Sequence, residues 1–216
     1  MWHALTLTVC LLGLSAAADS FTNPIGPGAD PWVFRWQNNY YRIGSGGGTL
    51  GVFKAAKLQD VAKAPRVTVW TPPSTGMWSK ELWAPELHYL DGKWYVYVAA
   101  DDGVNDNHRM YVLEGQSQDP QGQYAFKAKI SAPTDRWAID GSVLTLAGKN
   151  YFIWSGWPGA VNGAQNIYIA PMSNPWTISA ERVMISQPDY DWEKMGGPPT
   201  VNEGPDRKST RLNSSH

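Results

Sequence analysis

Four acidic residues recur along the chain at long and similar intervals. The intervals are 56, 54 and 63 residues, and they separate Asp30, Glu86, Asp140 and Glu203. Carboxylates that gather in one place repel one another, so such a group usually serves catalysis or metal binding. Two carboxylates on either side of a glycosidic bond are sufficient to hydrolyse it. These residues can do such chemistry only if the fold brings them together.

The sequence after three of these residues repeats one layout. Each acid begins a short apolar strand, a turn follows, and a strand rich in aromatic residues comes next, over 30–41, 86–98 and 140–154. The predicted turns have residue types that suit tight hairpins with positive φ: Asn38-Asn39, Asp91-Gly92 and Gly148-Lys149. A further β-like stretch follows each hairpin, at 49–57, 109–114 and 166–171. We therefore expect a repeating antiparallel unit.

The length of this repeat indicates a β-propeller. A period in the fifties suits a four-stranded blade, and no long stretch has the apolar spacing of a helix. In a propeller the innermost strands line a central channel, so equivalent positions on successive blades converge at one end of the axis. The four acids occupy similar places in their repeats, which predicts a pocket with several carboxylates. The predicted fold class is all-β.

Four short blocks around these acids resemble the signatures of glycoside hydrolase family 43, in order and in approximate spacing. The blocks are Gly28-Ala29-Asp30-Pro31-Trp32, Trp83-Ala84-Pro85-Glu86-Leu87, Ala138-Ile139-Asp140-Gly141-Ser142 and Asn202-Glu203-Gly204-Pro205. The resemblance covers residues 23–205 and implies a five-bladed β-propeller that hydrolyses glycosidic bonds with inversion. It implies that Asp30 is the general base that activates water, and that Glu203 is the general acid. Asp140 would then orient that acid and modulate its pKa, whereas Glu86 would shape the pocket without being catalytic.

Within the family, the chain is most similar to fungal α-L-arabinofuranosidases and exo-acting arabinanases. The expected activity is release of L-arabinofuranose from arabinan or arabinoxylan, with Trp83 and Trp157 packing against the sugar at the channel mouth. Alternatives stay open on the same fold: a β-xylosidase, an endo-arabinanase, or a retaining hydrolase of the fructan-cleaving kind with carboxylates about 5–5.5 Å apart. A propeller that binds sugar without catalysis would explain the aromatic residues but not the phased acids.

Composition argues against several other classes of protein. The chain has 18 basic and 19 acidic residues and no basic run, so neither nucleic acid nor a membrane surface is an expected partner. Twelve Trp and ten Tyr suit a β-rich fold that binds sugars. Cys10 is the only cysteine, so the sequence after it can form neither a disulfide nor a cysteine metal site. We expect a monomer that acts on plant cell-wall polysaccharide or its oligosaccharides.

Both ends of the sequence differ from the repeat region. Residues 1–18 combine an apolar run with a small-residue stretch, as in a signal peptide cleaved after Ala18, which predicts a secreted, extracellular protein. Residues 206–216 are polar, lack an apolar period and resemble translated sequencing-adapter DNA. The catalytic domain is therefore assigned to residues 19–205.

This domain accounts for about three blades and the start of a fourth, out of the five that the resemblance implies. We therefore expect a C-terminally truncated hydrolase that is inactive or poorly folded as written, because an unclosed ring leaves open sheet edges. No cofactor is expected to be required. Family members that hold a metal on the axis, often calcium, use a later histidine, which His3, His88 and His108 do not replace by spacing. A structural calcium is therefore expected only in a full-length parent.

Overall fold

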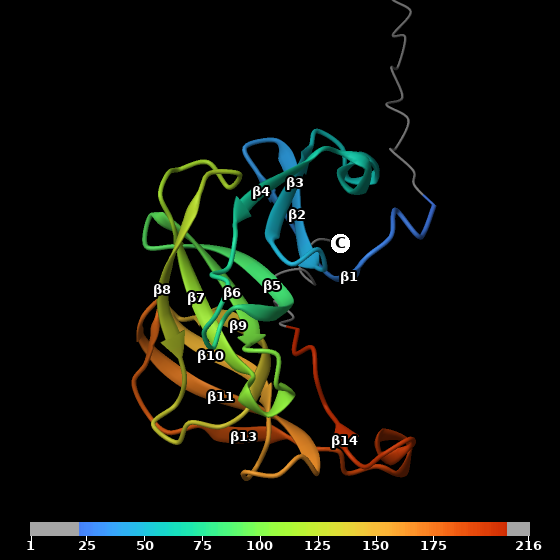
Figure 1. Cartoon of the computed structure of the whole chain (residues 1–216), viewed down its shortest axis with the longest axis vertical. Coiled ribbons are helices and arrows are strands. Elements are labelled where there is room, and N and C mark those ends of the chain that lie inside the picture. Colours follow the sequence, from blue (N-terminus) through green and yellow to red (C-terminus); the bar gives the residue numbers. More distant parts are fainter. Residues whose placement is uncertain (1–21, 207–216) are drawn as a thin grey trace, which may run out of the picture.

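Three antiparallel sheets follow one another along the part of the chain that the computed structural model describes, residues 22–206 (Figure 1). The predicted signal peptide (1–18) and all but the first residue of the predicted tail (206–216) lie outside this range. The first sheet contains β1 (Ala29–Trp36), β2 (Asn39–Ser45), β3 (Leu50–Ala55) and β4 (Arg66–Trp70). The second contains β5 (Lys80–Leu90), β6 (Lys93–Asp101), β7 (Arg109–Gly115) and β8 (Tyr124–Ile130).

The third sheet is less regular at its outer edge. It begins with β9 (Ala138–Leu146), β10 (Lys149–Gly156) and β11 (Ala164–Asn174). Two short strands, β12 (Thr177–Ile178) and β13 (Val183–Ser186), both pair antiparallel with β11 and together form the outer edge. The segment that the sequence assigns to a fourth blade instead contains β14 (Thr200–Val201), which pairs in parallel with the start of β11. From there the chain runs back toward the ends of β1 and β5 (Figure 1).

The helical segments in the described range are three short 3-10 turns. They are η1 (Leu58–Lys63), η2 (Asn105–Asn107) and η3 (Asp191–Lys194). Within residues 22–206, no helix has both the length and the hydrophobicity required to span a bilayer.

The middle sheet is buried on both of its faces, as its innermost hairpin shows. In β6, Trp94 and Val96 belong to the apolar core shared with the first sheet, whereas Tyr95 and Tyr97 belong to the core shared with the third. Side chains of a strand alternate between faces, so a strand with no polar face must lie between two layers. Sheets that pack face to face in chain order are blades, and the chain is part of a β-propeller, as predicted.

The hairpins between the two inner strands of each blade are tight two-residue turns, but two of the predicted turns are displaced by one residue. The turns are Gln37-Asn38, Asp91-Gly92 and Ala147-Gly148, and all six residues have positive φ. Asn38-Asn39 and Gly148-Lys149 were therefore wrong by one position, whereas Asp91-Gly92 was correct. Cross-strand pairing fixes the register, for example between Trp36 and Asn39, and overrides the preference of Asn and Gly for particular turn positions.

A β-bulge interrupts the innermost strand of each blade at the same position. The pairing register shifts between Ala29 and Trp32 in β1, between Trp83 and Glu86 in β5, and opposite Ile153–Ser155 in β9. The bulges contain Asp30, Ala84 and Asp140, whose φ angles of 50°, 41° and 53° are all left-handed. A bulge bends the strand and redirects a side chain, here toward the channel end of each blade.

This alignment corrects the predicted phase of Glu86. Ala84, not Glu86, is the blade-2 equivalent of Asp30 and Asp140, and each of these three residues lies six positions before the end of its strand. Glu86 lies two positions further along, level with Trp32. Glu86 nevertheless lines a hollow together with Asp30, Ala84 and Asp140.

Candidate active site

The three predicted catalytic carboxylates line one hollow. Asp30, Asp140 and Glu203 share a hollow of about 320 Å³ at the channel end of the blades. Asp30 comes from β1, Asp140 comes from β9, and Glu203 follows β14, so widely separated segments supply the three groups. The structure therefore brings together all the acids to which the sequence assigned a catalytic role.

Glu203 is held beside Asp140 by the backbone on either side of it. The Asn202 N–H donates a hydrogen bond to the Gln165 carbonyl oxygen at 3.0 Å, which extends the pairing of β14 with β11. The Gly204 N–H donates to Asp140 Oδ2, also at 3.0 Å. With both neighbours fixed in this way, the exposed Glu203 side chain is placed at the edge of the hollow.

The environment of Asp140 favours its protonated form. The pKa of Asp140 is raised from 3.8 to about 6, mainly by burial and in addition by the nearby charges of Glu203, Asp30 and Glu86. The hydrogen bond from the Gly204 N–H opposes this change because it stabilises the ionised carboxylate. Desolvation and like-charge repulsion therefore act together on the residue at the centre of the group.

Asp30 has a more open environment. Its side chain is exposed, and Oδ2 accepts a hydrogen bond of 2.5 Å from the hydroxyl of Ser45, the last residue of β2. Asp30 also lines a second hollow of about 460 Å³, which it shares with Asp140, Glu86 and Trp32. Asp30 therefore lies where several open spaces meet.

Glu86 lies in the second hollow and is engaged by a histidine. Its Oε2 contacts Nε2 of the buried His88 at 2.8 Å. It does not line the smaller hollow that contains Glu203. Glu86 thus lines the larger hollow, and its role in shaping the pocket stays a prediction.

The two predicted sugar-packing tryptophans occupy different positions. Trp83 lines the smaller hollow and stacks on His108, with ring centroids 3.9 Å apart. Trp157 is only 2% exposed and stacks at 4.9 Å on Trp137, which itself lines the hollow. Trp137 is itself only 4% exposed, so it belongs to the wall of the hollow but offers little ring surface to a ligand. The sequence feature that could have identified Trp137 as a residue of the site is its position immediately before the Ala138-Ile139-Asp140 block.

Sequence reasoning missed three amides on the wall of the hollow. Asn105 lies in η2, Asn162 lies in the loop before β11, and Gln165 lies near the start of β11. Amide side chains can both donate and accept hydrogen bonds, so they suit the hydroxyl groups of a sugar. They come from loops and a strand end, where the repeat carries no sequence signal.

One group in the described range brings metal-binding side chains close together. The ligand atoms of Glu81, Asp101 and His108 lie within 4.8 Å of one another. However, His108 Nδ1 already pairs with Asp101 Oδ2 at 3.0 Å, and both side chains are fully buried. Calcium takes six to eight oxygen ligands, so a histidine and two carboxylates do not fit it.

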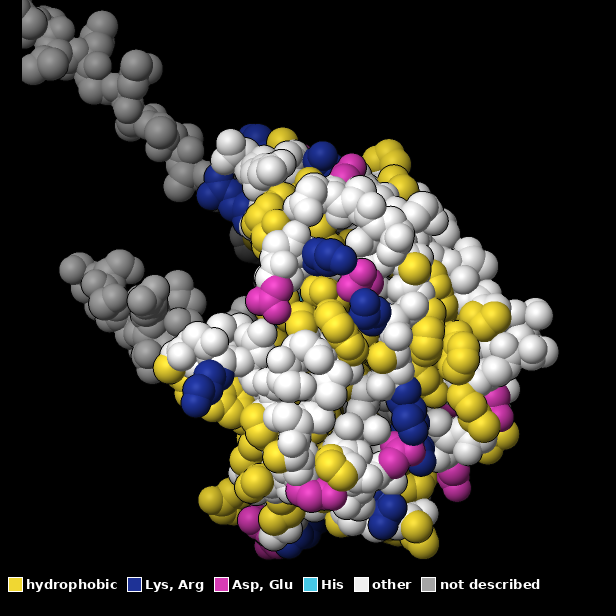
Figure 2. All heavy atoms as spheres, turned by 90° about the vertical axis from the view of Figure 1, so that its left-hand side faces the viewer, with side chains coloured by type: hydrophobic (Ala, Val, Ile, Leu, Met, Phe, Trp, Pro, Cys, Tyr) yellow, Lys and Arg dark blue, Asp and Glu magenta, His cyan; other side chains and the backbone are white. Residues whose placement is uncertain are grey.

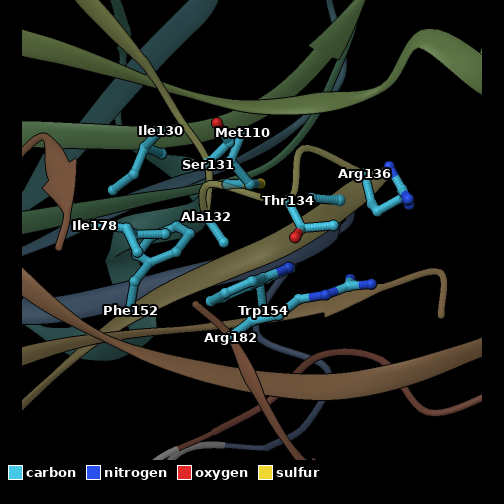
Figure 3. A pocket seen from close by; sticks show the side chains of 11 residues that line it. Met110, Ile130, Ser131, Ala132, Thr134, Arg136, Phe152, Trp154, Ile178 and Arg182 are labelled. Carbon is cyan, nitrogen blue, oxygen red and sulfur yellow. The ribbon is translucent and has the colours of Figure 1, made fainter. Parts of the chain in front are cut away.

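A separate cavity between the second and third blades is too small for a substrate. Its volume is about 10 Å³, and Met110, Phe152 and Trp154 are among the side chains that line it (Figure 3). None of the predicted carboxylates contributes to it. It lies in the interface between two blades.

The outer surface carries no concentration of one charge on the side shown in Figure 2. Basic and acidic side chains are interspersed there among apolar and neutral polar ones (Figure 2). Binding of nucleic acid depends on a concentrated positive patch, and this face has none.

Comparison with known proteins identifies the group to which this sequence belongs. Residues 21–208 match the family described as "Glycosyl hydrolases family 43". The chain is 37% identical over 196 residues to a protein of Streptomyces avermitilis named "Extracellular exo-alpha-(1->5)-L-arabinofuranosidase", covering 86% of this chain and 40% of that protein. It is 32% identical over 210 residues to "Alpha-L-arabinofuranosidase 43" of Humicola insolens, covering 94% of this chain and 43% of that protein. The chain thus spans well under half the length of these curated relatives.

A solved structure gives the same answer. The crystal structure of an α-L-arabinofuranosidase from Lactobacillus brevis superimposes with a TM-score of 0.74 at 35% identity. The match covers 79% of this chain and 57% of that one. The agreement of sequence, fold and the placement of the acids leads to one conclusion. This chain belongs to glycosyl hydrolase family 43.

Proposed function

We propose that the protein is an inverting glycoside hydrolase that releases L-arabinofuranose from arabinan or arabinoxylan. The observation that carries the proposal is the shared hollow of Asp30, Asp140 and Glu203. The names of the relatives from Streptomyces avermitilis and Humicola insolens support arabinofuranose as the sugar.

The proposed reaction uses two of the acids directly. Asp30 accepts a proton from a water molecule as the water oxygen bonds to the anomeric carbon. At the same time Glu203 donates its proton to the glycosidic oxygen as the bond from that oxygen to the anomeric carbon breaks. An inverting site holds its base and acid about 6.5–9.5 Å apart, so that water fits between the base and the sugar. The products are arabinose of opposite anomeric configuration and a shortened polymer.

Asp140 is proposed to support the proton donor and not to react itself. It receives the Gly204 N–H and thereby holds the segment that carries Glu203. Like charges held close together favour a state in which the pair carries one proton. A proton donor requires such a state at its working pH.

The substrate is proposed to enter over aromatic and amide side chains. The partly buried Trp83 offers its ring to the C–H face of the sugar, and Asn105, Asn162 and Gln165 offer hydrogen bonds to its hydroxyl groups. We propose a monomeric, secreted protein that needs no cofactor and acts on plant cell-wall polysaccharide. Determination of the N-terminal residue of the exported protein would test the predicted cleavage after Ala18.

The proposal is tested by hydrolysis of aryl α-L-arabinofuranoside and aryl β-xyloside. Two proteins are assayed: the 216-residue chain and the product of the re-sequenced locus, read past the codon for Pro205. Release of arabinose by either protein, with loss on Asp30→Asn, supports the proposal. Preference for the xyloside would indicate a β-xylosidase. Sugar binding with no hydrolysis by either protein would contradict the enzyme and favour a binding propeller.

A further inference from the structure

The hydroxyl of Ser45 connects two blades at the site. Ser45 ends β2 and pairs with Ala29, the residue before Asp30. Its Oγ lies 2.5 Å from Asp30 Oδ2 and 2.7 Å from the backbone nitrogen of Ala84 in β5. One side chain thus contacts the bulge of blade 1 and the bulge of blade 2.

The direction of these hydrogen bonds follows from the groups involved. A backbone N–H can only donate, so Ser45 Oγ accepts from Ala84. A serine hydroxyl has a single hydrogen, and an ionised carboxylate can only accept, so that hydrogen is directed at Asp30 Oδ2. The N–H polarises the hydroxyl and strengthens its bond to the carboxylate. A change of the Ser45 χ1 angle would therefore break both hydrogen bonds.

The position of Ala84 explains why its N–H is free to act in this way. Ala84 lies in the bulge of β5, where the pairing with β6 shifts between Trp83 and Glu86. A bulge leaves a residue without its usual partner in the ladder. The left-handed backbone at Ala84, with φ 41°, is sparsely populated for a non-glycine residue. This local geometry presents a backbone donor to Ser45.

We propose that Ser45 is a positioning residue that fixes the orientation of the Asp30 carboxylate. Oδ2 is committed to the hydroxyl, which leaves Oδ1 available to a water molecule in the hollow that Asp30 lines with Glu203. The inference rests on the proposed function, in which Asp30 is the base. It adds that blade 2, which has no acid at its bulge, contributes to catalysis through its backbone.

The first test compares three variants of Ser45 with one control variant, in whichever form of the protein hydrolyses the aryl arabinofuranoside. Ser45→Ala and Ser45→Val remove the hydroxyl, and kcat should fall about 10- to 100-fold, as expected for loss of a hydrogen bond to a charged group. KM should change by less than about twofold, because the hydroxyl faces Asp30 and not the sugar. Ser45→Thr keeps the hydroxyl with the shape of Val, and should retain activity within about threefold. Ser117→Ala, which removes a hydroxyl bonded to Asp119 on an exposed loop, is the matched control and should leave kcat unchanged.

The second test asks whether Ser45 acts through Asp30. In an Asp30→Asn background, adding Ser45→Ala should reduce the residual kcat by less than about twofold, because the group being oriented is already lost. A full 10- to 100-fold further loss, or equal losses in the Thr and Val variants, would overturn the positioning role. A normal kcat for Ser45→Ala beside a damaged Asp30→Asn would overturn this inference and leave the proposed function intact. Absence of hydrolysis by the wild-type protein would overturn both.

Discussion

The first and third blades each carry an aspartate at the bulge of their innermost strand, whereas the second carries alanine. The backbone is the same in all three places, with φ angles of 50°, 41° and 53° at Asp30, Ala84 and Asp140. The repeat therefore supplies a geometry that turns a residue toward the channel, and the side chain at that position decides what the blade contributes. Blade 2 contributes a backbone N–H, which reaches Ser45 at 2.7 Å.

The two aspartates also differ from each other, although their backbones agree. Asp30 is exposed and accepts a hydrogen bond from the Ser45 hydroxyl. Asp140 is partly buried beside three other acids, which raises its pKa to about 6. An open carboxylate suits proton transfer with water, and a more enclosed one suits control of a neighbouring acid. The same bulge thus supports two roles because the surroundings differ.

The largest expected change in kcat comes from substituting Asp30 or Glu203, and the choice of substrate distinguishes their two roles. Asp30→Asn should lower kcat about 10³-fold on every substrate, because the base acts on water whatever the leaving group. Glu203→Gln should lower kcat by a similar factor on arabino-oligosaccharides but by less than about tenfold on a dinitrophenyl arabinofuranoside, which needs no protonation. Steady-state kinetics on both substrates checks this. Equal losses of both variants on both substrates would contradict the assignment of base and acid.

The Asp140→Asn variant tests how the site affects stability. In the folded chain the pKa of Asp140 is about 6, against an ordinary value of 3.8. Between these values the folded state holds a proton that the unfolded state has released, so the free energy of unfolding falls as pH rises. This contribution is fully present below about pH 4 and is lost above about pH 6, and amounts to at most about 3 kcal/mol.

Asp140→Asn cannot ionise and should therefore gain about 1–3 kcal/mol in stability relative to wild type between pH 4 and pH 7.5. Urea unfolding at the two pH values measures this difference. An Asp60→Asn variant, on the exposed turn η1, should show no such gain. If the free energy of unfolding had the same pH dependence in the wild type and in Asp140→Asn, folding would not raise the pKa of Asp140.

The residue after each bulge offers a smaller test. It is Pro31 in blade 1, Pro85 in blade 2 and Gly141 in blade 3. A Cβ on Gly141 would overlap the ring of Phe152 and lie 2.7 Å from Met110 Cε, so Gly141→Ala should destabilise the chain by about 1–3 kcal/mol. Gly159→Ala, where nothing lies within 4 Å, is the control. Equal thermal midpoints for the two variants would mean that blades 2 and 3 pack less closely than described.

The smallest expected effect comes from making blade 2 resemble its neighbours. Ala84 lines the hollow of Asp30, Glu86 and Asp140, so Ala84→Asp adds another carboxylate to the group. Aspartate tolerates a left-handed backbone better than alanine does, so the main change is repulsion. We expect the free energy of unfolding of Ala84→Asp to be about 1 kcal/mol lower than that of the wild type at pH 7.5, and this difference should disappear at pH 4. Ala84→Asn supplies the same shape without charge and should show no such pH dependence. If Ala84→Asp were more stable than the wild type at pH 7.5, residue 84 would not lie in the same hollow as the other carboxylates.

The repeat in the sequence predicted the propeller architecture and the convergence of the acids, but it did not align the equivalent positions of the three blades correctly. Asp30, Asp140 and Glu203 were recognisable because their blocks are short, local and ordered. Glu86 was misaligned by two residues because its acidic type was followed instead of its distance from the hairpin turn, which is constant in all three blades. Counting back from the turn would have identified Ala84.

The residues that sequence reasoning missed depend on contacts between segments that are distant in the sequence. Trp137 lies in the wall of the hollow, where it stacks on Trp157 and donates a hydrogen bond to the Asn105 carbonyl oxygen. Ser45 has no sequence signal of its own, because its role depends on a backbone N–H from another blade. Such contacts between distant segments are determined by tertiary packing, and local pattern does not encode them.

The stereochemistry of the first product tests the central claim most directly. Proton NMR recorded during the first minutes of hydrolysis of an aryl α-L-arabinofuranoside distinguishes the two anomers before they equilibrate. A base and an acid on one hollow, with water attacking in a single step, predict that β-L-arabinofuranose appears first. Initial appearance of the α-anomer would show a covalent intermediate and a retaining mechanism, and would contradict the roles assigned to Asp30 and Glu203.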